Sequence, residues 1–167
     1  GGQYDTNGHS KFYGYGRLNA ETAVKLATQA APRVVTVNKL LNVPIPDLGS
    51  VEGTLDATET TPVGKVAVYV RLAHTYIGDL VITVVPPAQS GLSPVVLHNR
   101  AGGSRDNLEM LYDASNTPAL DAYAGKKCNG TWTVRVEDKA AQDSGTLMQI
   151  ALHLFLSSSP GVGGLLA

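Results

Sequence analysis

The apolar residues of this chain change their spacing at Pro32. Before this proline a helix is predicted over residues 19–30, because small apolar residues recur there at the spacing of one helical face: Ala20, Ala23, Val24 and Ala27. The residue before a proline avoids the α conformation, so the helix is expected to end at Pro32. After it, every second residue is apolar, which is typical of β-strands. The sequence therefore predicts one short helix followed by a β-rich body.

Several runs after Pro32 alternate clearly between apolar and polar residues. We predict strands over Arg33–Asn38, Val51–Asp56, Lys65–Leu72, Asp79–Val85, Val95–His98, Thr131–Glu137 and Thr146–Leu156, with weaker candidates at Leu40–Leu48 and Leu120–Ala124. The alternation places Trp132 on an apolar face, so we expect it in the core. About eight short strands without interleaved helices predict an all-β fold, an antiparallel jelly-roll β-sandwich.

Composition excludes several functional classes. The 167 residues carry a net charge of −1, and no cluster of lysine and arginine provides a surface for nucleic acid. No apolar run approaches the ~20 residues that span a membrane. Cys128 is the single cysteine, so no disulfide can form within the chain, and a zinc site built from cysteine and histidine is disfavoured.

No catalytic nucleophile is evident in the sequence. The chain lacks a Gly-x-Ser-x-Gly elbow, and it also lacks the Gly-Thr-Ser-x-Ala/Ser-x-Pro segment that carries the subtilisin nucleophile. The four histidines, His9, His74, His98 and His153, are scattered along the chain. Scattered serine, histidine and aspartate residues occur in most sequences by chance and do not indicate a triad, which is defined by geometry. We therefore expect this chain to have no enzymatic activity of its own.

Aspartates in turns are the candidate metal ligands. Asp138 and Asp143 lie in a predicted loop between two strands, and Asp79 begins another strand. Calcium takes six to eight oxygen ligands, which carboxylates and backbone carbonyls on loops supply. The alternative is that each carboxylate caps its own turn. The loop matches no EF-hand spacing, and we predict calcium as a cofactor with Asp79, Asp138 and Asp143 as its ligands.

His74 precedes the turn that leads to Asp79. One interpretation is ligand binding or pH sensing, because histidine changes charge near neutral pH. The alternative, which we favour, is a histidine that hydrogen-bonds the turn.

Two stretches resemble one protein family. The run Tyr13-Gly14-Tyr15-Gly16-Arg17-Leu18-Asn19-Ala20, with the helix after it, is similar to the carboxy-terminal end of a subtilisin-like catalytic domain. The run His74-Thr75-Tyr76-Ile77-Gly78-Asp79-Leu80 resembles the P domain, or Homo B domain, of kexin-like proteases and proprotein convertases. So do Gly130-Thr131-Trp132, Asp138 and Gly145-Thr146-Leu147 further on. The segment Pro86–Pro94 departs from the tight turn usual in that family.

The resemblance implies a domain organisation and a role. Residues 1–32 would be the tail and last helix of the catalytic domain, residues 33–157 the P domain, and residues 158–167 a linker. The P domain would be non-catalytic, stabilising a secreted serine endopeptidase and tuning its calcium and pH dependence. Its partner would be the catalytic domain of the same chain, with protein substrate as a further partner. The alternative is a jelly-roll module that binds protein substrate or carbohydrate.

Overall fold

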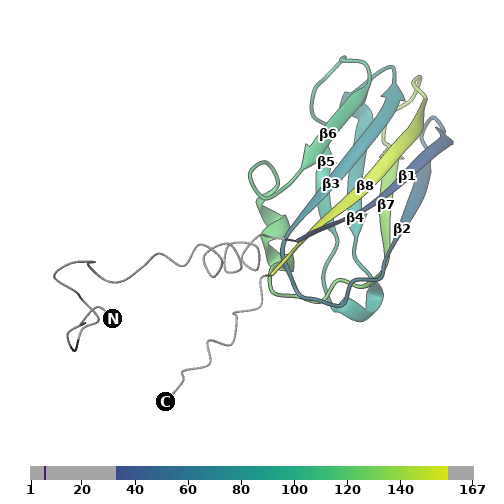
Figure 1. Cartoon of the computed structure of the whole chain (residues 1–167). Coiled ribbons are helices and arrows are strands. Elements are labelled where there is room, and N and C mark those ends of the chain that lie inside the picture. Colours follow the sequence, from purple (N-terminus) through teal and green to yellow (C-terminus); the bar gives the residue numbers. More distant parts are fainter. Residues whose placement is uncertain (1–5, 7–32, 158–167) are drawn as a thin grey trace, which may run out of the picture. The chain divides into compact units, whose positions relative to one another are not determined.

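Eight strands and three 3-10 helices make up the part of the chain that the computed structural model describes, which is residue 6 and residues 33–157 (Figure 1). The strands are β1 (Val34–Ile45), β2 (Ser50–Ala57), β3 (Val63–His74), β4 (Leu80–Val85), β5 (Val95–Asn99), β6 (Leu108–Tyr112), β7 (Gly130–Asp138) and β8 (Gly145–Leu156). The 3-10 helices are η1 (Ile77–Asp79), η2 (Ala88–Ser90) and η3 (Pro118–Tyr123).

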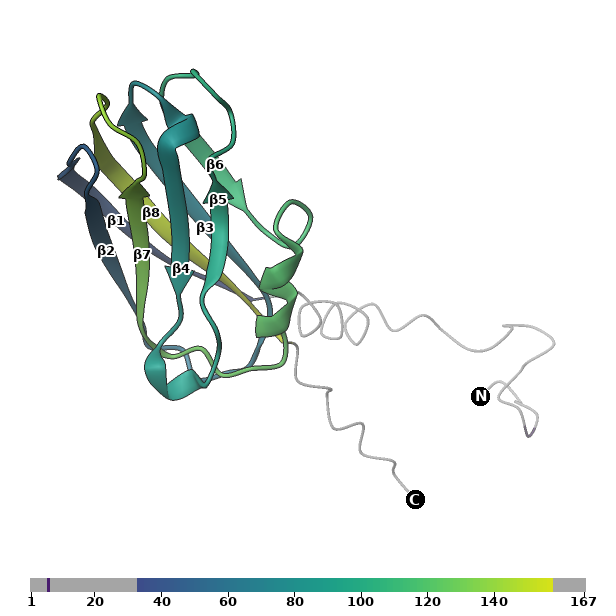
Figure 2. The ribbon, with the colours of Figure 1, turned by 180° about the vertical axis from the view of Figure 1, so that it is seen from behind.

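The strands form two four-stranded antiparallel sheets. One sheet has the order β1-β8-β3-β6, and the other has the order β2-β7-β4-β5. Figures 1 and 2 show the sheets as two layers, with β5 and β6 at one edge and β1 and β2 at the other. The chain crosses repeatedly between the layers, as in a jelly roll. The predicted all-β sandwich of about eight strands is confirmed.

Alternation of apolar and polar residues along each strand forms the apolar core between the two sheets. In β3 the side chains of Val66, Val68, Val70 and Leu72 point inward and are at most 1% exposed. In β2 the burial pattern alternates at every residue. Successive side chains of a strand point to opposite faces, so one face of each sheet forms the core. Burial of each large apolar side chain contributes about 1.5–3 kcal/mol.

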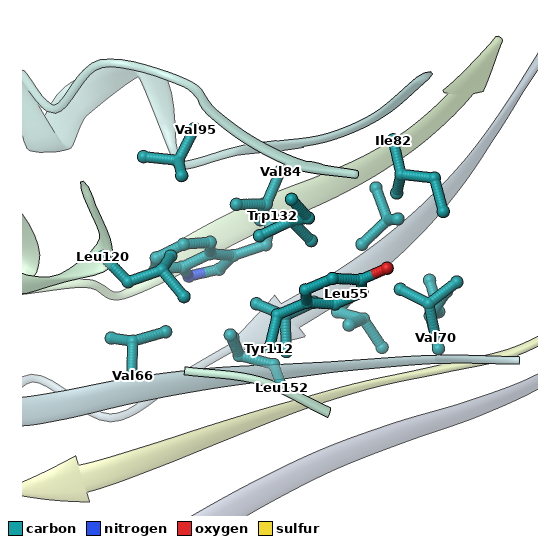
Figure 3. Close-up of a cluster of buried hydrophobic side chains, with 14 of the residues drawn as sticks. Leu55, Val66, Val70, Ile82, Val84, Val95, Tyr112, Leu120, Trp132 and Leu152 are labelled. Atoms are coloured by element: carbon teal, nitrogen blue, oxygen red, sulfur yellow. The ribbon is translucent and has the colours of Figure 1, made fainter. Parts of the chain in front are cut away.

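Trp132 of β7 lies in the middle of this core, as predicted. It has no measurable exposure, and Figure 3 shows its ring among side chains that include Val84, Val95 and Leu120. Its Nε1 donates a hydrogen bond to the carbonyl oxygen of Cys128 at 2.8 Å. A buried indole N–H without an acceptor would be costly, so the Cys128 carbonyl fixes the position of the ring.

The structure corrects several predicted strands. The segments predicted at Arg33–Asn38 and Leu40–Leu48 belong to the single strand β1, which has a bulge between Leu40 and Val43. The candidate strand Leu120–Ala124 was wrong, because residues Pro118–Tyr123 form η3. Proline suits the first turn of a helix, and its fixed φ favours this outcome. Strand β6 was not predicted.

Some predictions fall outside the described residues. They are the helix over residues 19–30, the assignment of residues 1–32 to a preceding domain, and the linker at 158–167. Within the described residues, no helix has the length and apolarity needed to cross a membrane.

Candidate functional site

Two strand ends bring His74 and Asp138 together. His74 ends β3 and pairs with Gly145, while Asp138 ends β7 and pairs with Leu80. The two side chains are 64 positions apart in sequence, yet His74 Nε2 lies 3.3 Å from Asp138 Oδ2. Neither side chain has measurable exposure. A buried carboxylate is costly unless it is paired and hydrogen-bonded, so each residue depends on the other for its burial.

The second ring nitrogen of His74 binds the turn that follows it. A carboxylate only accepts, so Nε2 carries the hydrogen that is donated to Asp138. Nδ1 lies 2.9 Å from the carbonyl oxygen of Tyr76 and 3.1 Å from its backbone nitrogen, so it contacts the peptide groups of the turn. The favoured interpretation of His74 as a residue that hydrogen-bonds its turn agrees with this contact. The ring therefore links the turn at Tyr76 to the end of β7.

Asn107 holds the backbone on the other side of His74. Its Oδ1 accepts the N–H of His74 at 3.2 Å, and its own N–H donates to the His74 carbonyl oxygen at 2.9 Å. Asn107 has a φ of 57°, in the left-handed region that asparagine tolerates better than most residues. The loop before β6 is thus fixed to the end of β3.

The three predicted calcium ligands lie at this end of the sandwich, but each contacts a different protein group. Asp138 Oδ1 accepts the N–H of Ala140 at 3.1 Å, so both of its oxygens are used. Asp79 Oδ1 lies 3.8 Å from a guanidinium nitrogen of Arg100. Asp143 Oδ1 accepts the hydroxyl of Thr75 at 2.5 Å. The main chain brings Asp79 near Asp138, since Lys139 N–H donates to the Asp79 carbonyl oxygen.

This arrangement does not form a shared cage for calcium. In residue 6 and residues 33–157, no group of three or more histidine, cysteine, aspartate or glutamate side chains is placed to hold a metal ion. Calcium needs six to eight oxygens, and the carboxylate of Asp138 is already occupied by two donors. The assignment of Asp79, Asp138 and Asp143 as metal ligands stays a prediction.

Gly145 permits the close approach of β8 to His74. A Cβ at this position would lie 2.2 Å from the Ala73 carbonyl oxygen and 2.6 Å from His74 Cδ2. The backbone oxygen cannot move without disturbing the β3–β8 pairing, so a side chain is excluded here. A glycine is therefore part of what positions the buried pair.

The other two histidines of residues 33–157 have different surroundings. His98 Nε2 lies 3.0 Å from the carbonyl oxygen of Ile77, and His153 Nδ1 lies 2.9 Å from the hydroxyl of Thr36. Neither these two histidines nor His74 is hydrogen-bonded to a serine hydroxyl within the described residues.

Sequence reasoning missed a cavity at the edge of the sandwich. It has a volume of about 490 Å³ and lies between β5 and β6, where Leu97, His98 and Met110 are among its lining residues. The period-two spacing of Leu108, Met110 and Tyr112 was the available signal. It was overlooked because Met110, Leu111 and Tyr112 are consecutive apolar residues, so the alternation is incomplete.

Comparisons with known proteins agree with the fold. The family model of the proprotein convertase P-domain matches residues 63–154, which contain β3 to β7 and most of β8. The crystal structure of a serine protease of Aeromonas sobria matches with a TM-score of 0.56 and 21% identity, over 94% of this chain and 33% of that one. At this identity the match shows a shared fold.

Two curated proteins also match. "Calcium-dependent protease" of Trichormus variabilis is 44% identical over 155 residues, 92% of this chain and 23% of the relative. "Leupeptin-inactivating enzyme 1" of Streptomyces exfoliatus is 42% identical over 76 residues, 46% of this chain and 15% of the relative. The chain thus spans less than a quarter of either relative. The first match is longer than residues 33–167, so it extends into residues 1–32.

Proposed function

Because the chain belongs to the proprotein convertase P-domain family, we propose that residues 33–157 are the non-catalytic P domain of a secreted subtilisin-like serine endopeptidase and stabilise its catalytic domain. The observation that carries the proposal is the family match over residues 63–154, on a complete two-sheet sandwich. Residues 1–32 would be the end of the catalytic domain, and residues 158–167 a linker.

The relatives support a protease as the parent protein. One is named a calcium-dependent protease, and its similarity to this chain continues into residues 1–32. That continuation is expected if the same domain precedes the sandwich in both proteins. Secretion of the parent is what the family resemblance implies.

The sandwich is suited to act as a stabilising unit because it has its own core. Its interior includes Trp132 and the inward side chains of both sheets, so it does not need another domain to bury them. A second domain docked on such a body gains about 25 cal/mol for each Å2 of apolar surface removed from water. Docking then slows the unfolding of the catalytic domain. The rate of unfolding limits the lifetime of many exported proteins.

Calcium and pH tuning belong to the same proposal. The name of the Trichormus relative supports calcium dependence of the parent. In this chain Asp143 is the candidate that we take to bind calcium, because it lies in the loop before β8 and no residue between 33 and 157 donates to its second oxygen. The pH dependence rests on the family resemblance alone.

The non-catalytic assignment is tested directly on the chain itself. We expect the 167-residue chain to show no labelling by a fluorophosphonate probe and no hydrolysis of a generic peptide substrate. A subtilisin treated in parallel is the positive control. Labelling of any serine of this chain, lost on replacement of that serine by alanine, would overturn the assignment.

A further inference from the structure

The interior of the sandwich is incompletely filled at the edge formed by β5 and β6. Met110 pairs with Val70, and its neighbours Leu108 and Tyr112 pair with Leu72 and Val68. Residues directly opposite in an antiparallel pair share a face, so all three β6 side chains point between the sheets. Leu108 and Tyr112 are 6% and 4% exposed, whereas Met110 is 44% exposed.

The cavity beside Met110 has an apolar floor. Its volume is about 490 Å³, within the usual range for a binding pocket. The buried side chains of Ile77, Leu97, Leu108 and Tyr112 line it. Arg105, Asp106 and Glu109 also line it, and Glu109 already accepts the hydroxyl of Tyr69. These three charged side chains are all exposed, whereas the buried side chains that form the floor of the cavity are apolar. The interior of the cavity therefore suits an uncharged apolar group.

His98 provides a polar contact within the cavity. It is 9% exposed, and its Nε2 donates to the Ile77 carbonyl oxygen at 3.0 Å, since a carbonyl only accepts. In the neutral ring Nδ1 is then an acceptor, and no residue between 33 and 157 donates to it. An N–H group of a ligand would satisfy this acceptor.

The backbone at the cavity favours a peptide over a small molecule. β5 is the last strand of its sheet and is hydrogen-bonded to β4 on one side only (Figure 2). An extended peptide can add to such an edge and direct alternate side chains toward one face. At β6 the corresponding edge is partly covered, because Asn116 Nδ2 donates to the Leu111 carbonyl oxygen.

We infer that this cavity is a peptide-binding site. An extended, uncharged peptide segment pairs with the free edge of β5 and inserts one aliphatic side chain between β5 and β6. The inserted side chain contacts Leu97 and Met110, and a peptide N–H donates to His98 Nδ1. Neither His74 nor Asp138 lines the cavity, although Asn107, which hydrogen-bonds the His74 backbone, does. The inference does not depend on the proposed stabilising role.

The test is an NMR titration of the full 167-residue chain. The probe is the blocked peptide acetyl-Thr-Thr-Leu-Thr-Thr-amide, and the comparison peptide has aspartate in place of leucine. We expect saturable shifts of the amide signals of Leu97, His98 and Met110. The aspartate peptide should bind at least about tenfold more weakly, because a charge cannot replace the buried aliphatic group.

Two matched variants locate the site. Met110→Trp fills the cavity and should abolish binding, whereas Leu111→Trp should not, because Leu111 is 47% exposed on the opposite face of the same strand. Preserved dispersion of the NMR spectrum shows that each variant folds. No saturable shift at about 10 mM leucine peptide would overturn the inference. So would equal binding by both variants, or shifts that follow protein concentration without peptide, which would indicate a second copy of the chain.

Discussion

His74 Nε2 lies 3.3 Å from Asp138 Oδ2, with both side chains fully buried at the ends of two strands from different sheets. The contact connects β3 of one layer to β7 of the other. It also orders the turn at Tyr76 through the second ring nitrogen. Two residues that are separate in the sequence thus hold the loops at one end of the sandwich.

We expect removal of one member of this pair to destabilise the domain strongly. Asp138→Ala leaves the His74 ring and the Ala140 N–H without their acceptor, at a cost of about 3 kcal/mol in the free energy of unfolding. Urea denaturation measures this cost. Asp121→Ala, at an exposed position in η3, should cost about 0.5 kcal/mol or less. A loss below about 1 kcal/mol for Asp138→Ala would show that the pair is not important for stability.

Gly145→Ala is expected to destabilise the same region by steric conflict. The added methyl group would meet the Ala73 carbonyl oxygen and the His74 ring, and such overpacking costs about 1–3 kcal/mol. Gly64→Ala is the control, because its nearest contact would be an ordinary 3.6 Å. Thermal unfolding of the two variants compares them directly. Equal melting temperatures would contradict the packing at Gly145.

Stability should fall at alkaline pH. Burial raises the pKa of the Cys128 thiol to about 11 and the pKa of Tyr112 to about 12, above their ordinary values of 9.0 and 10.0. Between the ordinary and the raised pKa, the folded state binds more protons than the unfolded state. The contribution of these two protonated groups to the free energy of unfolding is therefore complete below pH 9 and is lost progressively from about pH 9 to 12.

Tyr112→Phe isolates one part of this effect. The variant keeps the buried ring but removes the ionisable hydroxyl, so its stability should fall less steeply than that of the parent chain above pH 10. The measurement is the free energy of unfolding at a series of pH values from 8 to about 11.5. Parallel curves for the two proteins would mean that Tyr112 ionises equally in both states.

Calcium should raise the melting temperature if Asp143 is a ligand. A ligand that binds only the folded state stabilises it by about 2.7 kcal/mol at a concentration of 100 times Kd. Calorimetry with calcium and with a chelator measures the difference, and Asp143→Ala should remove it. Asp121→Ala, which is outside the site, should retain it. An identical melting temperature with calcium and with chelator would exclude the predicted metal site.

The alternation of apolar residues predicted most of the fold. It identified the inner row of β3 and the burial of Trp132, because a period of two depends only on the local sequence. It did not identify η3, where Leu120 and Tyr123 are buried by a 3-10 turn that starts at Pro118. Nor did it identify β6, where Met110, Leu111 and Tyr112 are consecutive apolar residues and the alternation is incomplete.

The sequence predicted the residues of the candidate site but not the contacts between them. The sequence drew attention to His74 and Asp138 separately, with calcium expected at the second. Their pairing depends on the register of β3 with β8 and of β4 with β7, which no local pattern specifies. The cavity beside Met110 depends likewise on how two sheet edges meet.

The lifetime of the parent protease tests the proposed role most directly. Residual activity would be followed at a fixed elevated temperature and calcium concentration, for the whole protein and for a form that lacks residues 33–157. The proposal predicts equal initial turnover and a half-life shortened by about tenfold or more without the sandwich, with Asp138→Ala in between. Equal half-lives for the two forms would contradict it.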